Sequence, residues 1–408
     1  MAYVPLVYFS FLFLYILRKK GFDVSAFVTL LYVITSFFSL LMFNLKLIDI
    51  KQSSPSLFST IVYCSLITLS ILPIYGFNTN NLKLKLTSKT EKAIRVLTYV
   101  FFANFIAFLI QRLSEIYRIL VYGDFLALRQ EIMGEEVGHV SGFSGFFIIL
   151  INILSSISFV MIFVYFVTIT YYKKSWKISL LAFLGTLPMV LGGIMTVNRS
   201  DVFYYILIFG ICVVLFWRHV ANREIKRFFI PVAVLFAGMI TYFSVVTVDR
   251  FDNTQTEYGS VNNSLIEYAG MPYSNFCYFY DNYQNPDWMS TRYLFPVSNF
   301  IFNGYRAGTI REQEQSNRTG FNCVAFMTFL GSFVMDSNQI MPFVFIIIYL
   351  FLFRICRYHK KNNTVSFVWL LAVFLLITIP AVGCLSYFYT NPYKSAALYA
   401  LFFFLPKK

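Results

Sequence analysis

The sequence predicts an all-α fold, a polytopic bundle of about eleven transmembrane helices (ten to twelve) with a long external loop containing short helices. Apolar runs of about 15–25 residues fill most of the 408 positions, and the loops between them differ strongly in charge. The mean hydropathy is +0.66, and hydrophobic residues make up 58% of the chain against 13% charged. A helix needs roughly 20 apolar residues to cross a bilayer, where backbone polar groups must be satisfied within the segment.

The eleven predicted spans belong to one integral membrane domain, residues 1–408. In chain order they cover residues 2–17, 24–45, 56–77, 94–111, 146–170, 178–197, 202–217, 228–248, 340–355, 365–388 and 394–405. The first run lacks a basic n-region and a cleavage site, and Arg18, Lys19 and Lys20 follow it at once. We therefore expect a retained helix rather than a signal peptide.

Charge on alternating loops orients the spans. One set of loops holds 21 basic and three acidic residues, and the other set holds 12 basic and 16 acidic residues. Cytoplasmic loops carry the lysine and arginine excess, so the first set is predicted to face the cytoplasm. The amino terminus then lies outside and the carboxyl terminus inside. The net charge of +14 is accordingly a topology signal, and we expect no nucleic-acid partner.

A short apolar stretch, residues 321–335, fits this orientation only as a re-entrant or half-crossing segment. It is interrupted at its end by Asp336, Ser337, Asn338 and Gln339. A full crossing would reverse everything after it, and the basic cluster between Arg354 and Lys361 argues against that. Non-helical backbone at membrane depth is tolerated where protein buries it or where it lines a cavity.

Two outside loops are long, residues 112–145 and 249–322, whereas every cytoplasmic loop is short. Long loops in compact proteins usually serve a function, so we expect function on the external face. The sequence contains no Walker-type phosphate loop and no dinucleotide-binding glycine pattern, and its histidines and cysteines are too scattered for a zinc site. No cofactor and no metal are predicted. Cys277 and Cys323 both fall on the outer side, where they are able to pair.

Loop 249–322 carries five arginines, no lysine, eight acids and many tyrosines. The arginines are Arg250, Arg292, Arg306, Arg311 and Arg318. Their planar forks suit phosphate oxygens, while aromatic faces such as those of Tyr273 and Tyr305 suit sugar rings. The mixture fits a ligand that bears both phosphate and carbohydrate. The alternative is a solvated loop whose charges pair with one another and whose tyrosines form an interfacial belt.

Two shorter motifs stand at predicted span ends. Asn198–Arg199–Ser200–Asp201 forms a polar turn after Gly192–Gly193, and segment 318–339 runs from Arg318 and Asn322 through an apolar stretch to Asp336. An arginine at membrane depth is a functional candidate, and a broken helix presents backbone dipoles to a headgroup. Each motif also has a plain structural interpretation, a tight turn in the first case and a helix cap in the second.

The whole layout resembles a bacterial oligosaccharide repeat unit polymerase, the O-antigen or capsule polymerase class called Wzy. The likeness covers about eleven spans, short cytoplasmic loops and one long external loop before the last spans. Locally, residues 198–201 resemble the family's arginine-bearing turn, and residues 322–336, NCVAFMTFLGSFVMD, resemble its stretch after the loop.

The resemblance implies metal-independent, inverting glycosyl transfer on the external face of the bacterial inner membrane. A glycan leaves undecaprenyl diphosphate and joins the next lipid-linked repeat unit, and a chain-length regulator and a flippase of the same pathway are candidate partners. The departing diphosphate needs cations, which we assign to Arg199, Arg292, Arg306 and Arg318. The acceptor hydroxyl needs a base, for which Glu267, Asp281 and Asp336 are candidates, and Asn322, Tyr273 and Tyr305 are expected to contact the glycan.

Two other classes of protein remain open. An O-antigen ligase or another lipid-linked-sugar glycosyltransferase shares the external chemistry, but related ligases favour a loop histidine, and loop 249–322 has none. A flippase or transporter usually places charges within its spans and shows internal repeats. Here nearly all charges lie at span ends or in loops.

Overall fold

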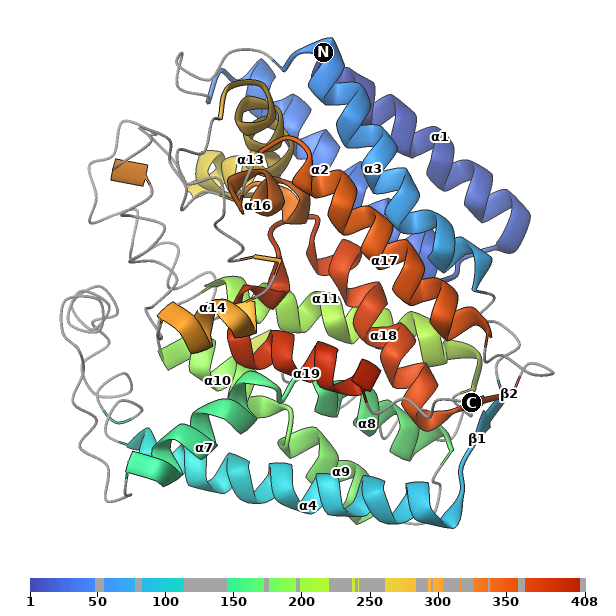
Figure 1. Ribbon diagram of the computed structural model, residues 1–408, viewed down its shortest axis with the longest axis vertical. Helices are drawn as coiled ribbons and strands as arrows, with labels where there is room; N and C mark the ends of the chain where they lie inside the picture. Colours follow the sequence, from blue (N-terminus) through green and yellow to red (C-terminus); the bar gives the residue numbers. More distant parts are fainter. Residues whose placement is uncertain are drawn as a thin grey trace. The chain divides into compact units, whose positions relative to one another are not determined.

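The computed structural model is mostly helical in the residues it describes (Figure 1). These are residues 1–47, 55–77, 83–113, 117, 145–171, 176–195, 199–219, 237–238, 241, 261–283, 293–294, 296–303, 316–317, 326–336, 338–358 and 364–403. The chain divides into two compact units. Unit 1 comprises Met1–Lys85 with Asn262–Lys408, and unit 2 comprises Leu86–Val261.

Unit 1 begins with three helices that lie side by side (Figure 1). They are α1 (Tyr3–Lys20), α2 (Val24–Asn44) and α3 (Leu57–Gly76), close to the ranges that the sequence predicts. Asp23 caps α2 by accepting from the Ala26 N–H at 2.9 Å, and Ser56 caps α3 by accepting from the Ser59 N–H at 3.0 Å. Both caps satisfy donors that the first helical turn leaves free, which fixes where each span starts.

The remainder of unit 1 comes from the second half of the chain. It contains α13 (Val261–Asn282), α14 (Pro296–Asn303), α16 (Thr328–Asp336), α17 (Met341–Tyr358), α18 (Phe367–Val382), the 3₁₀ turn η2 (Phe388–Thr390) and α19 (Pro392–Phe403). Helix α13 is 22 residues long and falls within the predicted external loop 249–322. The sequence predicts only short helices in this loop. The polar composition of Val261–Asn282 does not form the long apolar run by which a longer helix would be predicted.

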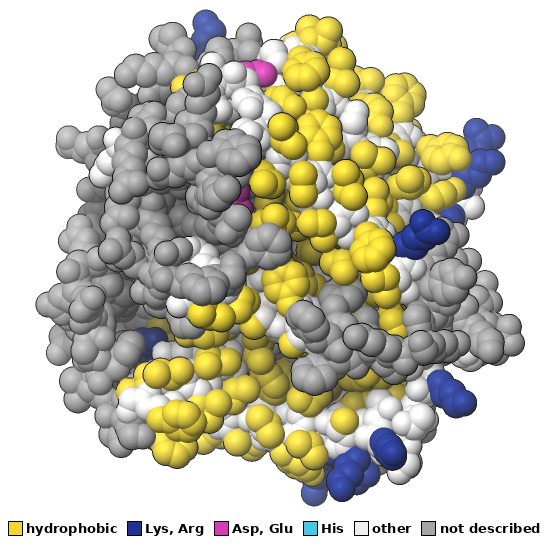
Figure 2. Space-filling model, viewed as in Figure 1, with side chains coloured by type: hydrophobic (Ala, Val, Ile, Leu, Met, Phe, Trp, Pro, Cys, Tyr) yellow, Lys and Arg dark blue, Asp and Glu magenta, His cyan; other side chains and the backbone are white. Residues whose placement is uncertain are grey.

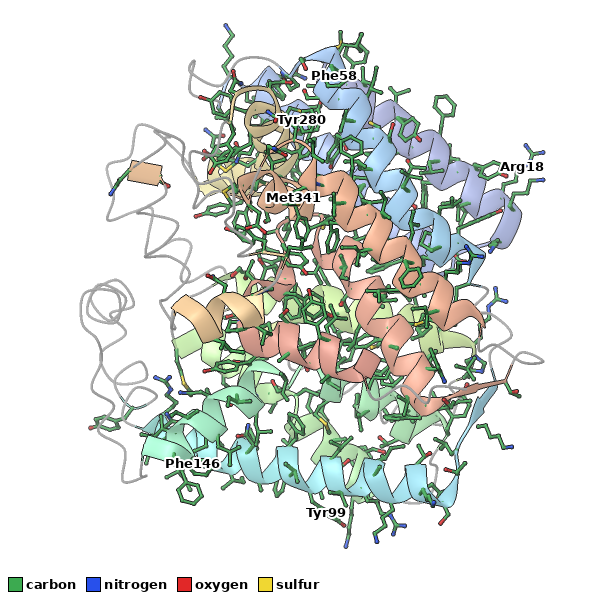
Figure 3. The ribbon with its side chains drawn as sticks, viewed as in Figure 1. Arg18, Phe58, Tyr99, Phe146, Tyr280 and Met341 are labelled. Atoms are coloured by element: carbon green, nitrogen blue, oxygen red, sulfur yellow. The ribbon has the colours of Figure 1, made fainter. Side chains whose placement is uncertain are left out.

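Contacts within unit 1 group its chain reversals at two ends. At one end the Lys20 ammonium donates to the Tyr75 carbonyl, and β1 (Lys83–Lys85) pairs in parallel with β2 (Thr364–Ser366). At the other end, Phe58 of α3 lies against Tyr280 of α13, far from Arg18 (Figure 3). The first three helices of unit 1 therefore run back and forth between these two ends.

Two chain segments of unit 1 are broken rather than straight. Helices α16 and α17 meet at 118°. The predicted span 365–388 is also shorter than expected: α18 ends at Val382, and the chain then runs through Gly383 and η2 into α19. The cause is tertiary, because the Thr328 N–H donates to the Leu385 carbonyl and the Phe329 N–H to the Gly383 carbonyl, both at 2.9 Å. These bonds take carbonyls that a continued helix would use itself.

Unit 2 is helical throughout its described part. Its elements are α4 (Ser88–Gln111), α7 (Gly145–Ser156), α8 (Val160–Thr170), α9 (Trp176–Leu184), α10 (Leu187–Met195), α11 (Arg199–Phe216) and η1 (Trp217–His219). Helix α4 starts six residues before the predicted span 94–111. Thr87 caps its first turn, which is charged and helical but not apolar, so hydrophobicity alone does not mark it. The predicted span 146–170 bends by 60° between α7 and α8.

Among the described residues, five helical segments are long and apolar enough to cross a membrane. The number rises to seven if α7 with α8 and α16 with α17 each count as one bent span. Hydrophobic side chains dominate the described part of the face in Figure 2, with lysines and arginines at its margins. On α1, for example, Phe11 is 70% exposed although it lies in the middle of an apolar helix. An exposed apolar surface of this kind suits lipid rather than water. Among the predicted spans, 228–248 lies almost wholly outside the described residues.

Candidate functional site

Helix α13 carries the polar chemistry of the predicted external loop and is docked into unit 1. The Tyr273 hydroxyl hydrogen-bonds Thr60 Oγ1 of α3 at 2.7 Å, and Asn275 Nδ2 donates to the Phe326 carbonyl at 2.7 Å. A Cβ added at Gly270 would lie 2.7 Å from the Phe38 carbonyl oxygen of α2. The glycine therefore lets two backbones approach where any side chain would separate them.

The three candidate base residues occupy different environments. Asp336, at the end of α16, is 1% exposed. Its carboxylate accepts from the Tyr293 N–H at 2.8 and 2.9 Å and from the Leu294 N–H at 2.8 Å. Backbone donors occupy both carboxylate oxygens, so neither is open to accept the proton of a substrate hydroxyl. It anchors the chain immediately after Arg292 instead.

Asp281 stands exposed at the end of α13, next to the start of α3. One carboxylate oxygen accepts from Ser56 Oγ and the other from Ser59 Oγ, each at 2.9 Å. The helix amino terminus adds a favourable electrostatic environment for the negative charge. Both oxygens are thus engaged in holding α13 to α3.

Glu267, three residues before Gly270 on α13, is half-buried. Desolvation raises the pKa of its carboxyl above the usual value, and within the described part of the chain it forms no hydrogen bond. A base is most effective when its pKa approaches the working pH, and it needs a free oxygen. Of the three carboxylates, Glu267 matches these requirements best.

The break between α16 and α17 is tied to the end of α13. Gln339 Nε2, within the break, donates to the carbonyls of Tyr280 at 3.1 Å and Tyr283 at 3.4 Å. These bonds satisfy carbonyls at a helix carboxyl terminus that would otherwise lack donors. Thr328, at the other end of α16, has a φ of 59°, and its buried Oγ1 has no hydrogen-bond partner in the described part of the chain. A left-handed threonine is a strained residue at the entrance of a fully buried helix.

The remaining predicted site residues are distributed as follows. Arg199 begins α11 in unit 2, and the structure describes its backbone only. The predicted ligand residues outside the described part are Arg292, Arg306, Arg318, Tyr305 and Asn322. Tyr273 is 1% exposed, so its ring has no free face for a sugar and belongs to the core between α3 and α13. Cys277 is a free thiol, and Cys323 lies outside the described residues.

Several polar residues have structural roles that the sequence does not mark. Ser56, Ser59 and Gln339 join segments that are far apart in the chain, so no local pattern marks them. Asn104 and Gln111 differ, because both stand inside the apolar span predicted at 94–111. Polar residues inside a span are rare and are functional candidates, which was a usable signal.

Within the described residues, no group of three or more histidine, cysteine, aspartate or glutamate side chains is arranged to hold a metal ion. Comparison of the chain with protein-family models, with curated proteins and with solved structures gives no match.

Proposed function

We propose that this protein polymerises undecaprenyl-diphosphate-linked oligosaccharide repeat units into O-antigen or capsular polysaccharide. The docking of α13 is the observation that supports the proposal most. A merely solvated loop would not commit Asp281, Asn275 and Gly270 to contacts with α3, Phe326 and α2. A polar helix fixed beside a broken apolar segment is suited to hold a ligand whose tail is lipid and whose head is polar.

The proposed reaction is an inverting glycosyl transfer without a metal. A hydroxyl oxygen of the acceptor repeat unit attacks the anomeric carbon of the donor glycan, and the bond from that carbon to the diphosphate oxygen breaks. Glu267 takes the hydroxyl proton, while Arg199 with Arg292, Arg306 and Arg318 stabilises the negative charge on the departing diphosphate. Asn322 and Tyr305 are the remaining proposed glycan contacts.

The finer topology is part of the same proposal. It has eleven spans in the bacterial inner membrane, a periplasmic amino terminus and a cytoplasmic carboxyl terminus. Residues 249–322 would then form the periplasmic loop, and 321–335 the re-entrant segment that returns toward it. The bend of 118° between α16 and α17 is consistent with a re-entrant course. A chain-length regulator and a flippase are the protein partners to expect.

The test is surface polysaccharide from a strain that lacks the gene, separated on a gel beside complemented strains. We expect the polymer ladder to collapse to core plus one repeat unit without the gene and with Arg199→Ala or Arg318→Ala. Arg18→Ala is the matched control, because Arg18 is exposed on α1 away from Tyr280 of α13 (Figure 3), and its substitution also removes one positive charge. Membrane levels of each variant must equal those of the wild type. A full-length ladder in both arginine variants would refute the assignment.

A transporter is the second candidate, and the broken elements of unit 1 favour it. Interrupted helices in transporters place helix ends around a substrate site near the middle of the membrane. The same gel separates the two readings: an unchanged ladder in the deletion strain moves the assignment toward transport. Complete loss of the decorated band would indicate a ligase or an earlier assembly step.

A further inference from the structure

Helix α4 carries two buried amides whose hydrogen-bonding capacity is largely unused. Asn104 is 4% exposed and Gln111 is 5% exposed, and they lie seven residues apart with Phe108 between them, on one face of the helix. Asn104 Nδ2 donates to Ser155 Oγ at 3.2 Å. Asn104 Oδ1, Gln111 Oε1 and Gln111 Nε2 are buried and have no hydrogen-bond partner among the residues that the structure describes.

The surroundings make this arrangement costly. Phe108 packs with Ile151 and Met195, and Ala107 and Leu191 cover the same cluster. Moving an amide from water into such an apolar setting without a hydrogen bond is strongly unfavourable. Nearly every buried polar side chain in native proteins has a partner. Two amides that lack a partner among the described residues and share one helix face are therefore suited to bind a molecule from outside the chain.

The position of the amides within unit 2 indicates which kind of molecule they bind. The cluster joins Phe108, near the end of α4, to Met195, at the end of α10. Gln111 thus lies at the end of unit 2 where α10 finishes and where Arg199 starts α11. At position 192 of α10, an added Cβ would be in ordinary contact with Phe108 Cζ at 3.8 Å, so α10 faces α4 here without crowding it.

We propose that Asn104 and Gln111 bind hydroxyl groups of the carbohydrate part of the lipid-linked substrate. An amide offers one acceptor and two donor hydrogens, and a hydroxyl is both donor and acceptor, so the two groups match without any charge. About 10 Å of helix axis separates the two residues, enough to contact different hydroxyls of one oligosaccharide. That the hydroxyls belong to a sugar rests on the proposed function.

The experiment compares the wild type with Gln111→Met, which keeps the length of the side chain and removes its polar atoms. Binding of an extracted undecaprenyl-diphosphate-linked oligosaccharide to the purified protein is measured by native mass spectrometry, and thermal unfolding is measured without ligand. We expect the affinity to fall about tenfold or more while the melting temperature stays unchanged or rises. Thr98→Val is the matched control, because Thr98 is a buried polar residue of α4 whose Oγ1 already donates to the Ile94 carbonyl.

Each outcome decides the matter. Equal glycolipid binding by wild type and Gln111→Met, or no binding by the wild type, overturns the site. A lower melting temperature in Gln111→Met would show that the amide serves the protein itself, which also overturns it. If Gln111→Met loses binding while deletion of the gene leaves the polymer ladder intact, the carbohydrate site stands and the polymerase assignment fails.

Discussion

The two units treat their buried carboxylates and amides in opposite ways. In unit 1, the buried Asp23, Asn275 and Asp336 each make hydrogen bonds to backbone groups. In the described part of unit 2, the buried Asn104 and Gln111 leave three amide atoms unpaired. The unpaired buried atoms of unit 1, within its described part, are hydroxyl oxygens only.

The difference separates polar groups that build the fold from polar groups that await a ligand. Unit 1 contains the broken segments, and each break frees backbone donors and acceptors that must be satisfied again in an apolar setting. Its buried carboxylates and amides bond such backbone groups: Asp23 at the start of α2, Asn275 before α16, and Asp336 directly after Arg292. Unit 2 has bends but its amides are not used to repair them. Substitutions that remove polar groups should therefore harm stability in unit 1 and spare it in unit 2.

Glu267 is the exception in unit 1, and Glu267→Gln should have the largest effect of the changes considered. Loss of a general base typically reduces the rate by about 10²–10⁴-fold. We expect polymerisation by reconstituted protein to fall by at least about 100-fold while ligand binding is retained. Asp281→Asn is the control, since its carboxylate is engaged by two serines. Comparable activity in Glu267→Gln and wild type would remove Glu267 from the mechanism.

The pH dependence of Glu267 gives a second readout. Desolvation raises the pKa of its carboxyl in the folded state, so the protonated form favours folding. This stabilisation is complete below the unfolded pKa and is lost as pH rises through the folded pKa. The wild type should therefore lose stability over that window more than Glu267→Gln does. The acid limb of the activity profile should follow the same raised pKa, and a limb at the pKa of an ordinary glutamate would contradict the assignment.

Asp336→Ala should be the most destabilising substitution in unit 1. It leaves the N–H groups of Tyr293 and Leu294 without their buried acceptor, at a cost of about 3 kcal/mol in the free energy of unfolding. The measurement is thermal or denaturant unfolding of the purified protein in detergent. Asp281→Ala supplies the control, because the same change there removes an exposed carboxylate. If both variants have the same free energy of unfolding, the buried Asp336 contributes no more to stability than the exposed Asp281.

Gly270→Ala should cause the next largest loss in the free energy of unfolding. The added methyl would lie 2.7 Å from the Phe38 carbonyl oxygen and 2.9 Å from the Ser39 Cα, so α13 must move away from α2. Overpacking of this kind costs about 1–3 kcal/mol. Gly145→Ala in α7 is the matched control, since no described residue has an atom within 4 Å of its added Cβ. Equal stability of the two variants would mean that α13 is not held tightly against α2.

The ends of the apolar helices were predictable because capping and hydrophobic runs are local. The predicted span 24–45 corresponds to Val24–Asn44, and 56–77 to Leu57–Gly76. The break after Val382 was not predictable, because it depends on bonds from Thr328 and Phe329, more than fifty residues earlier. The pairing of β1 with β2 joins residues about 280 positions apart and carries no sequence signal at all.

The sequence predicts which residue types make up the candidate site, but it does not predict the role of each residue. The sequence singles out Glu267, Asp281 and Asp336 equally, since all three are acids near one loop. Burial and hydrogen bonding then separate them: Asp336 anchors the chain at Tyr293, Asp281 contacts α3, and Glu267 forms no hydrogen bond within the described residues. Tyr273 shows the limit of composition most clearly: a tyrosine in a polar helix looks like a ligand contact, yet its ring is core. Only packing against α3 decides between the two.

Ser59→Ala should have the smallest effect and tests how far the contrast between the units extends. Ser59 is itself buried, but its hydroxyl donates to Asp281, whose carboxylate is exposed and can turn to water when the hydroxyl is lost. We expect a loss of about 1 kcal/mol or less in the free energy of unfolding. A double-mutant cycle with Asp281→Asn measures the coupling, which should be well below the cost of Asp336→Ala. A coupling as large as that cost would mean that exposed polar contacts hold unit 1 together as firmly as buried ones, and the contrast would then rest on Asn104 and Gln111 alone.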